Sequence, residues 1–549
     1  MATVDTIVRE ARTAPELVLQ RASRRSVFLW TNGLALLVVS VFLRCWHLGN
    51  IPGINGDEAW YGVQALRVAS GQSISWLTPT GNPINPFYFL PHVVLHYFLS
   101  PSVVALRAVA LASGLAALAI NYALCRRAFD LRTARVSTLL LALLPVNIAY
   151  SRFGWDASQS LAATLLVMYL PLVRLRASAG GSALGAGAMF AAAAAILVHP
   201  TNVFALALVF VPVVYVHRKG LGRTVRRTKM PANTWVFALL VALVGLSAWV
   251  AWQCAPLAIA RLNGPREIGP FLAGYLRLFS GTTVYQFISG AGLATPETGW
   301  YQHTTVACNL GFGLLGLWAL WGFALRIVTI PTATDACLAW GWLLMLAAFF
   351  LVAGPRAVSP HFERYAICLI APGALVVSRG LCWWMDDSRT DGRRLVVALA
   401  LAAWLWPASY YVNYFRPFLE RGGLSHATFR TGEVDLKQSA LRYVLAERDV
   451  RQPVEIVCHE WWSYWPLAYL AFREPDVHVV TSDQWQRVTA PGSDRSAETW
   501  FVEYGGSSGE RDALRAIAGT EARRHAVLDY GLRPAIWVIG PVEKLSRNY

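Results

Sequence analysis

The chain has 549 residues, of which 55% are hydrophobic and only 15% are charged, and its mean hydropathy is +0.42. This mixture cannot cover the surface of a soluble protein, and uncharged stretches of about 20 residues, enough to cross a hydrocarbon core of about 30 Å, recur along it. The net charge of +16 lies in short segments between these stretches. It therefore indicates membrane orientation, and we exclude nucleic-acid binding as a main role.

Apolar segments long enough to form membrane-spanning helices follow one another along the chain. They fall at about 27 to 47, 103 to 124, 134 to 150, 158 to 175, 182 to 199, 202 to 217, 233 to 255, 305 to 327, 336 to 353, 365 to 384 and 395 to 413. A further segment, Phe87 to Leu99, is too short to cross and contains two His residues, so we expect it to lie in the membrane interface. The pattern predicts a polytopic α-helical membrane protein with about eleven spans.

Basic residues predict the orientation of these spans. If Phe87 to Leu99 does not cross, most basic clusters fall on one side, and the short connections on the other side carry only Arg152, Arg356 and Arg364. The clusters on the first side are the Arg residues before residue 26, Arg126, Arg127, Arg132, Arg135, Arg174, Arg176, the run from Arg218 to Lys229, Arg326, Arg389, Arg393 and Arg394. The positive-inside rule then places the N-terminus in the cytoplasm and the C-terminus outside it. The first span has no small-residue cleavage signal near its end, so we expect it to be retained.

This topology divides the chain into a cytoplasmic segment (1–26), a membrane core (27–413) with outer loops at 48–102 and 256–304, and an extracytoplasmic tail (414–549). The tail is predicted to be a small α/β domain because strand-like and helix-like patterns alternate in it. The predicted strands are 454–458, 477–481, 499–504 and 535–539, and the predicted helices are 436–448, 461–472 and 511–518. No G-x-G-x-x-G or Walker sequence occurs in the tail, so we expect no nucleotide cofactor.

The string Asn55-Gly-Asp57-Glu58-Ala-Trp-Tyr61 follows the first span and places two adjacent carboxylates at the start of a helix on the outer face. A capping role accounts for polar and acidic residues at such a position. The alternative is a catalytic role for Asp57, in which its carboxylate exchanges a proton with a substrate at the membrane surface.

A second acid lies in the string Tyr150-Ser-Arg152-Phe-Gly-Trp-Asp156, and the topology puts Asp156 on the same face as Asp57. Two carboxylates and a guanidinium are what acid–base chemistry on a phosphorylated substrate requires. A local ion pair between Arg152 and Asp156, four residues apart, accounts for the same residues without a function.

Two further outer segments carry candidate residues. His199 precedes Pro200 at a sharp turn between two spans, where a hydrogen-bonded structural role competes with direct function. The pair Arg364-Tyr365 lies just before a later span, where it can bind a lipid phosphate or only extend its polar ends to the interface.

In combination, these segments resemble the polyprenyl-phosphate-sugar-dependent glycosyltransferases of the GT-C fold, close to the protein mannosyltransferase and aminoarabinose transferase families. The resemblance covers roughly the first 210 residues well, the stretch 355 to 380 moderately and the tail loosely. It is carried by the order of these motifs: Asp57-Glu58 with Tyr61, Asn85-Pro86 with Tyr88, Arg126-Arg127 with Phe129, Tyr150-Ser-Arg152 with Asp156, His199-Pro200 and Arg364-Tyr365.

The resemblance implies a polyprenyl-phosphate sugar donor held in the membrane lipid, an extracytoplasmic acceptor that is a protein, lipid or polysaccharide, and a single inverting displacement. It implies two catalytic carboxylates: Asp57, as general base or acceptor-binding group, and Asp156, as the second acidic residue of the site. The implied substrate-binding residues are Glu58, Tyr61, Arg152, His199, Arg364 and Tyr365. Some relatives use a Lys in the first outer loop to bind the phosphate; here that contact is absent or made by an Arg such as Arg67. A contribution of Glu58 to a divalent metal site stays open.

Two other classes of protein fit parts of the sequence. A transporter or flippase would place ionisable residues near the bilayer midplane, whereas the candidates here lie at the outer ends of spans. A membrane-anchored binding protein would depend on the tail alone. We therefore expect a multi-pass enzyme of the bacterial inner membrane with its site on the extracytoplasmic face.

Overall fold

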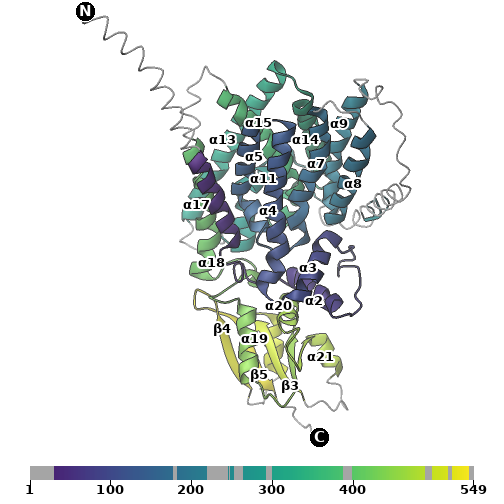
Figure 1. Cartoon of the computed structure of the whole chain (residues 1–549). Helices are drawn as coiled ribbons and strands as arrows, with labels where there is room; N and C mark the ends of the chain where they lie inside the picture. Colours follow the sequence, from purple (N-terminus) through teal and green to yellow (C-terminus); the bar gives the residue numbers. More distant parts are fainter. Residues whose placement is uncertain are drawn as a thin grey trace, which may run out of the picture.

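The protein consists of a helical bundle and a smaller sheet domain, with helices α2, α3 and α20 between them (Figure 1). The computed structural model describes residues 30–176, 182–218, 264–291, 299–386, 399–488, 497–516 and 522–542, with a few residues between 245 and 252. The predicted cytoplasmic segment 1–26 and most of the predicted span 233–255 lie outside these ranges.

The bundle is built from apolar helices that run back and forth between its two ends. They are Trp30–Cys45, α4 (Val103–Ala128), α5 (Leu131–Leu143), α6 (Pro145–Tyr150), α7 (Ser160–Arg176), α8 (Ser182–Val198), α9 (Ala207–Arg218), α11 (Ile268–Ser280), α12 (Thr282–Val284), α13 (Gly299–Thr329), α14 (Ala333–Val352), α15 (Ile370–Asp386), α17 (Leu405–Tyr410) and α18 (Arg416–Arg421). Shorter turns of helix connect them: η1 (Asp156–Gln159), η2 (Pro200–Leu206), η3 (Tyr285–Ser289), η4 (Pro355–Val358), η5 (Glu363–Leu369) and η6 (Tyr411–Phe415).

Several of these helices have the length and composition of membrane spans. Within the described ranges, five helical stretches are long and apolar enough to cross: Val103–Ala128, Asp156–Arg176, His303–Thr329, Ala333–Val352 and Glu363–Asp386. The predicted segment 134–150 is divided instead, because Pro145 begins a separate helix after α5 ends. The chain is thus a membrane protein, while the number and direction of its spans stay predictions.

The segment expected at the membrane interface forms helix α3 (Pro86–Phe98), which has 13 residues. One face is buried and includes His92. The other face exposes apolar side chains, with Tyr97 62% and Phe98 82% accessible. A short helix that is apolar even on its open face fits a position along the surface of a bilayer.

The tail forms a five-stranded sheet with the order β2-β1-β3-β5-β4. Its elements are η7 (Ala427–Phe429), α19 (Leu436–Glu447), β1 (Val454–Cys458), α20 (Trp461–Leu470), β2 (Val477–Thr481), α21 (Ser482–Val488), β3 (Glu498–Tyr504), α22 (Ser508–Ala516), β4 (Arg523–Leu528) and β5 (Pro534–Val542). Strands β2, β1 and β3 are parallel, and β5 is antiparallel to β3 and β4. The four predicted strands and three predicted helices are present, whereas β4 and α21 had no predicted counterpart.

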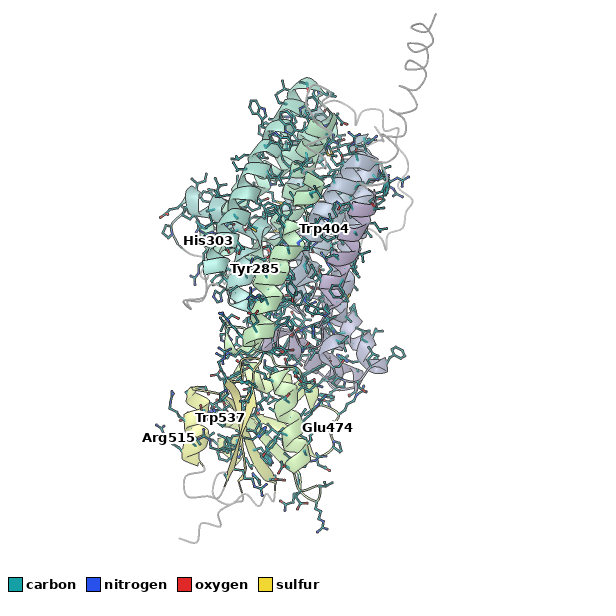
Figure 2. All side chains as sticks on the ribbon, turned by 90° about the vertical axis from the view of Figure 1, so that its left-hand side faces the viewer. Tyr285, His303, Trp404, Glu474, Arg515 and Trp537 are labelled. Atoms are coloured by element: carbon teal, nitrogen blue, oxygen red, sulfur yellow. The ribbon has the colours of Figure 1, made fainter. Side chains whose placement is uncertain are left out.

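The tail packs on the bundle through α20 and α2 (Gly56–Ala69). Two glycines of α2 permit the close approach: a Cβ on Gly56 would lie 2.6 Å from a ring carbon of Trp461, and one on Gly62 would lie 2.6 Å from the ring of Tyr469. Figure 2, in which Glu474 and Trp537 mark the tail, shows side chains filling the region between the two parts. The tail is therefore held against the end of the bundle where α2 begins.

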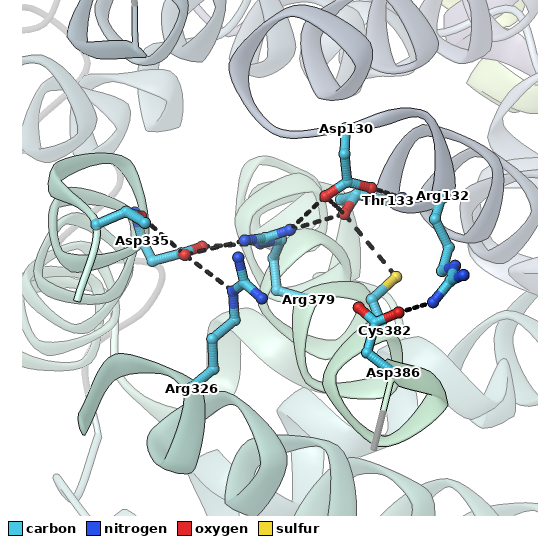
Figure 3. A network of polar contacts seen from close by, with 9 residues as sticks. Asp130, Arg132, Thr133, Arg326, Asp335, Arg379, Cys382 and Asp386 are labelled. Carbon is cyan, nitrogen blue, oxygen red and sulfur yellow. Dashed lines mark hydrogen bonds and ion pairs between the residues drawn. The ribbon is translucent and has the colours of Figure 1, made fainter. Parts of the chain in front are cut away.

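The opposite end of the bundle is fastened by a network around Arg379 (Figure 3). Its guanidinium donates to Asp335 at 2.8 and 2.9 Å and to Asp130 at 2.9 Å, so it joins α15 to the start of α14 and the cap of α5. Arg326 donates to the same Asp335 carboxylate at 3.0 Å. Arg379 and Asp335 are 2% and 0% exposed, so each charge is compensated within the protein.

Replacing Arg379 by Met should strongly destabilise the bundle, because the buried Asp335 carboxylate would keep Arg326 as its only charged partner among the described residues. Removing one member of a buried ion pair costs about 3–5 kcal/mol. The matched control is Arg416→Met, whose pair with Glu420 is half exposed and contributes about 0.3–0.5 kcal/mol. The measurement is the midpoint of thermal unfolding in detergent; equal midpoints for the two variants would contradict the structural role of this network.

Candidate active site

Asp57 lies in the first turn of α2, at the junction of the bundle and the tail. Asn55 caps the helix, and its side chain accepts a hydrogen bond from the Asp57 backbone N–H at 2.8 Å. The capping role weighed from the sequence therefore falls to Asn55, which leaves the Asp57 carboxylate free for other contacts. Its Oδ1 accepts a hydrogen bond from the indole N–H of Trp461 at 3.2 Å, so the tail contacts this acid directly.

Glu58, the neighbouring acid, points into the protein. It is 0% exposed, and its Oε1 accepts from Arg107 at 2.7 Å and from the Asn55 backbone N–H at 2.8 Å. Its Oε2 accepts from Arg107 at 3.2 Å and from the Gly154 backbone N–H at 2.9 Å. Both oxygens are thus occupied within the protein, and we assign Glu58 a structural role in place of the predicted substrate contact or metal ligand.

Asp156 begins η1, directly after the segment that Glu58 holds in place. One carboxylate oxygen accepts from the Ala157 backbone N–H at 2.8 Å, and the other accepts from the Tyr61 hydroxyl at 3.3 Å. Tyr61 comes from α2, so the hydrogen bond joins the two predicted motifs. Asp57 and Asp156 are both partly buried.

Arg364, at the start of η5, is near enough to both acids for its positive charge to favour their ionised forms. The guanidinium packs 4.9 Å from the ring of Trp155 and 5.1 Å from that of Tyr365. These rings hold it in a defined position without neutralising its charge.

His199 packs against Tyr365, whereas Arg152 is fully buried and bonds to other segments. The His199 ring lies 5.7 Å from the Tyr365 ring, and its Nδ1 is 2.7 Å from the Thr201 hydroxyl, so it packs at the margin of the Arg364 group. Arg152 is 0% exposed and donates to the backbone carbonyl oxygens of Leu43 and Ile51 at 2.7 and 2.9 Å. The structure therefore gives Arg152 neither the ion pair with Asp156 nor a place beside Arg364.

The pKa of the Asp57 carboxyl is raised above its ordinary value by burial. The nearby carboxylates of Asp156 and Glu58 act in the same direction. The Arg364 guanidinium and the hydrogen bond from Trp461 oppose these effects, because both favour the ionised form. A raised pKa makes the carboxylate a better proton acceptor, and the pKa of a catalytic base is expected to lie closer to neutrality than that of a free aspartate.

Two contacts of this region were not predicted. Trp461 contacts Asp57 from the far end of the sequence, and only the docking of α20 reveals that contact. Glu363 precedes Arg364, is 0% exposed and accepts a hydrogen bond from the Tyr150 hydroxyl at 3.3 Å. The only sequence signal for Glu363 was its position next to the predicted pair Arg364-Tyr365. The burial of its side chain depends on the turn formed by η5.

The group combines two partly buried carboxylates with one guanidinium at the end of an apolar bundle. Such a set can accept a proton and bind an anionic phosphate in the same place. Within the described part of the chain, no three His, Cys, Asp or Glu side chains gather closely enough to hold a metal ion. The structure thus brings together the residue types that acid–base chemistry on a phosphorylated substrate requires.

The fold is shared with known membrane glycosyltransferases. The crystal structure of ArnT from Cupriavidus metallidurans bound to undecaprenyl phosphate matches 95% of this chain and 99% of its own, with a TM-score of 0.51 and 14% identity. The apo form of the same protein matches 95% of this chain and 98% of its own, with a TM-score of 0.52 and 13% identity. At this identity the likeness concerns the fold alone, and the chain has the GT-C fold, as predicted.

A more distant structure is that of the Archaeoglobus fulgidus oligosaccharyltransferase in its apo form, at 15% identity over 82% of this chain and 64% of that one. Its TM-score of 0.44 is too low to carry an argument. No family model matches the sequence, and no curated protein matches it.

Replacing Trp461 by Phe should move the acidic limb of the pH–rate profile to higher pH. The variant keeps an aromatic ring but loses the hydrogen bond that favours ionised Asp57, so the already raised pKa rises further. Because a base is active only when ionised, activity is lost as pH falls through that pKa. The measurement is kcat/KM for donor consumption against pH.

Trp462→Phe is the matched control, since the Trp462 ring packs against His426 at 5.4 Å, whereas Trp461 is the ring that contacts Asp57. It should leave the acidic limb in place. An acidic limb that stays fixed, or moves to lower pH, in the Trp461 variant would show that Asp57 is not the titrating base.

Proposed function

We propose that this protein is an integral-membrane glycosyltransferase that moves a sugar from a polyprenyl-phosphate carrier to an acceptor on the tail side of the membrane. The observation that carries the proposal is the meeting of Asp57, Asp156 and Arg364, from three distant segments, at one end of an apolar helix bundle. The shared fold with ArnT, a protein crystallised with undecaprenyl phosphate, supports the class of carrier.

The position of the site suits a lipid-linked donor. The hydrocarbon chain of such a carrier stays in the bilayer, so its phosphate can be reached only at the membrane edge, with the sugar projecting outward. Arg364 is the group we assign to the phosphate, with the adjacent Tyr365 hydroxyl as a further donor. A cation there stabilises the negative charge that the leaving phosphate gains as the bond to the sugar breaks.

Asp57 is the base in this reaction. The acceptor hydroxyl gives its proton to Asp57 while its oxygen attacks the anomeric carbon, and the bond from that carbon to the phosphate oxygen breaks with its electron pair on the phosphate. Asp156, oriented by the Tyr61 hydroxyl, is placed to hold sugar hydroxyls during the attack. A single displacement of this kind inverts the anomeric configuration.

The location of the charged groups favours an enzyme over a transporter. Transporters bind their substrates near the bilayer midplane, at broken helices. Here the candidate acids lie where the bundle meets the tail, because Asp57 accepts a hydrogen bond from Trp461 of α20 and Tyr61 of α2 donates to Asp156.

Asp57→Asn should reduce consumption of a lipid-phosphate sugar at least 100-fold, because general-base catalysis contributes about 10²- to 10⁴-fold. Asp156→Asn should reduce it strongly as well. The measurement is turnover of purified polyprenyl-phosphate sugars by full-length protein in lipid nanodiscs. Asp386→Asn, at the exposed pair with Arg132, is the control and should keep wild-type turnover. Full turnover by both site variants would refute the assignment.

We also propose that the tail and the site face the extracytoplasmic side of a bacterial inner membrane. The basic residues Arg132 and Arg326 lie at the end of the bundle away from the tail, which agrees with the positive-inside rule. In intact cells, Arg515→Cys in a variant without the native cysteines should react with a membrane-impermeant maleimide, whereas Arg132→Cys should react only after permeabilisation. The reverse pattern would overturn this orientation.

A further inference from the structure

We propose that a pocket between the tail and helix α2 binds the carbohydrate part of the acceptor; this inference rests on the proposed glycosyl transfer. The pocket has a volume of about 370 Å³. It is lined by residues from α2, from the segment that follows β1, from α20, from the end of β2 and from α21. Asp57, Asp156 and Arg364 do not line it.

The location of the pocket within the tail is one that favours ligand binding. His459 and Glu460 directly follow β1, and Thr481 ends β2, so these lining residues lie at the carboxyl ends of two parallel strands. Open sheets with parallel strands bind ligands outside those ends. In this protein the same edge of the sheet faces α2, so a ligand there would contact the tail and the bundle together.

Aromatic rings form one part of the lining. Trp461, Tyr464 and Trp465 lie on one face of α20 at helical spacing, and all three are only partly buried. Their rings pack against one another at centroid distances of 5.3 and 4.8 Å, which fixes their orientation. Flat rings held in place suit the C–H faces of sugar rings, which are the apolar surfaces of an otherwise polar ligand.

The remaining lining residues are polar, and three of them keep side-chain groups unpaired among the described residues, whereas His459 pairs with Asp512. No described side chain or carbonyl group bonds to the Arg67 guanidinium or to the Glu460 carboxylate, and the Gln484 amide N–H groups are likewise free among the described residues. One guanidinium, one carboxylate and one amide, from three elements, converge on one pocket without pairing with each other. Sugar hydroxyls both donate and accept, so a carbohydrate can satisfy all three at once.

The pocket is connected to the candidate active site by a shared side chain. Trp461 lines the pocket and donates its indole N–H to Asp57. Arg67 follows Asp57 by ten residues, so their Cα atoms lie about 15 Å apart along α2, at about 1.5 Å per residue. This span is longer than one sugar ring, so the occupant we infer is an oligosaccharide or a glycolipid headgroup whose reactive end reaches Asp57.

We assign Arg67 to the acceptor and Arg364 to the donor. The sequence offered Arg67 as a replacement for a donor-phosphate Lys, but Arg364 is the cation within reach of both acids. A second hollow, of about 500 Å³, is also lined by Arg67, together with Trp60 and residues between Ser73 and Pro79. Arg67 therefore borders two hollows at the tail side, where an acceptor would enter.

The test is binding of full-length protein in lipid nanodiscs to an array of immobilised neutral and acidic oligosaccharides, without any donor. The wild type should retain a discrete set of glycans. Tyr464→Ala and Arg67→Gln should weaken retention at least tenfold, and the nearly isosteric Glu460→Gln should weaken it without lowering the midpoint of thermal unfolding. Arg515→Gln, at an edge of the tail and 80% exposed, is the matched control and should bind as the wild type does (Figure 2).

Binding and turnover test the pocket and the transferase activity separately. Asp57→Asn should keep glycan retention, because the acid acts on the proton and not on the remote sugars. Donor consumption together with no retained glycan, or with pocket variants that bind as the wild type does, would overturn the pocket and leave the proposed function standing. Pocket-dependent binding by a protein that consumes no lipid-phosphate sugar would confirm the pocket and overturn the transferase activity.

Discussion

The buried Glu58 carboxylate joins the parts of the protein on which the candidate site depends. It accepts hydrogen bonds from the cap of α2, from Arg107 on α4 and from the backbone at Gly154. A Cβ on Gly154 would lie 2.8 Å from this carboxylate, so only glycine permits the contact. Because Asp57 adjoins Glu58 and Asp156 follows Gly154 by two residues, this ion pair sets the relative positions of the two catalytic candidates. Loss of either member would leave a buried charge without its partner.

The site also depends on the tail, which is more than an appendage to the bundle. Its helix α20 brings Trp461 to Asp57, and the glycines of α2 let the two helices approach closely. A candidate catalytic group on α2 and an aromatic group of the tail are therefore in direct contact. We infer that the bundle binds the lipid carrier and the tail binds the acceptor, with Asp57 at their boundary.

Much of the fold was predictable because its driving forces are recorded locally in the sequence. Apolar runs of spanning length and Arg-rich connections indicated a membrane bundle, and alternating patterns indicated the strands of the tail. Strand β4 escaped prediction because it begins with Arg523 and Arg524 and is largely exposed at the edge of the sheet, so it lacks an apolar face. The division of segment 134–150 at Pro145 was signalled by the proline but hidden within a continuous apolar run.

The sequence by itself determined that the chain lies in a membrane, the order of the acidic and basic motifs, and that Asp57 and Asp156 lie on the same side of the bundle. These properties depend on the length of apolar segments and on the charge of the loops, which act without long-range contacts. The tertiary structure decided which polar side chains turn inward. It made Glu58 and Arg152 buried structural residues, placed Arg364 beside both acids and brought Trp461 to Asp57 across 404 positions of the chain. Those outcomes depend on how desolvated charges find partners when distant helices pack, and adjacent acids such as Asp57 and Glu58 carry no local signal of which one will be buried.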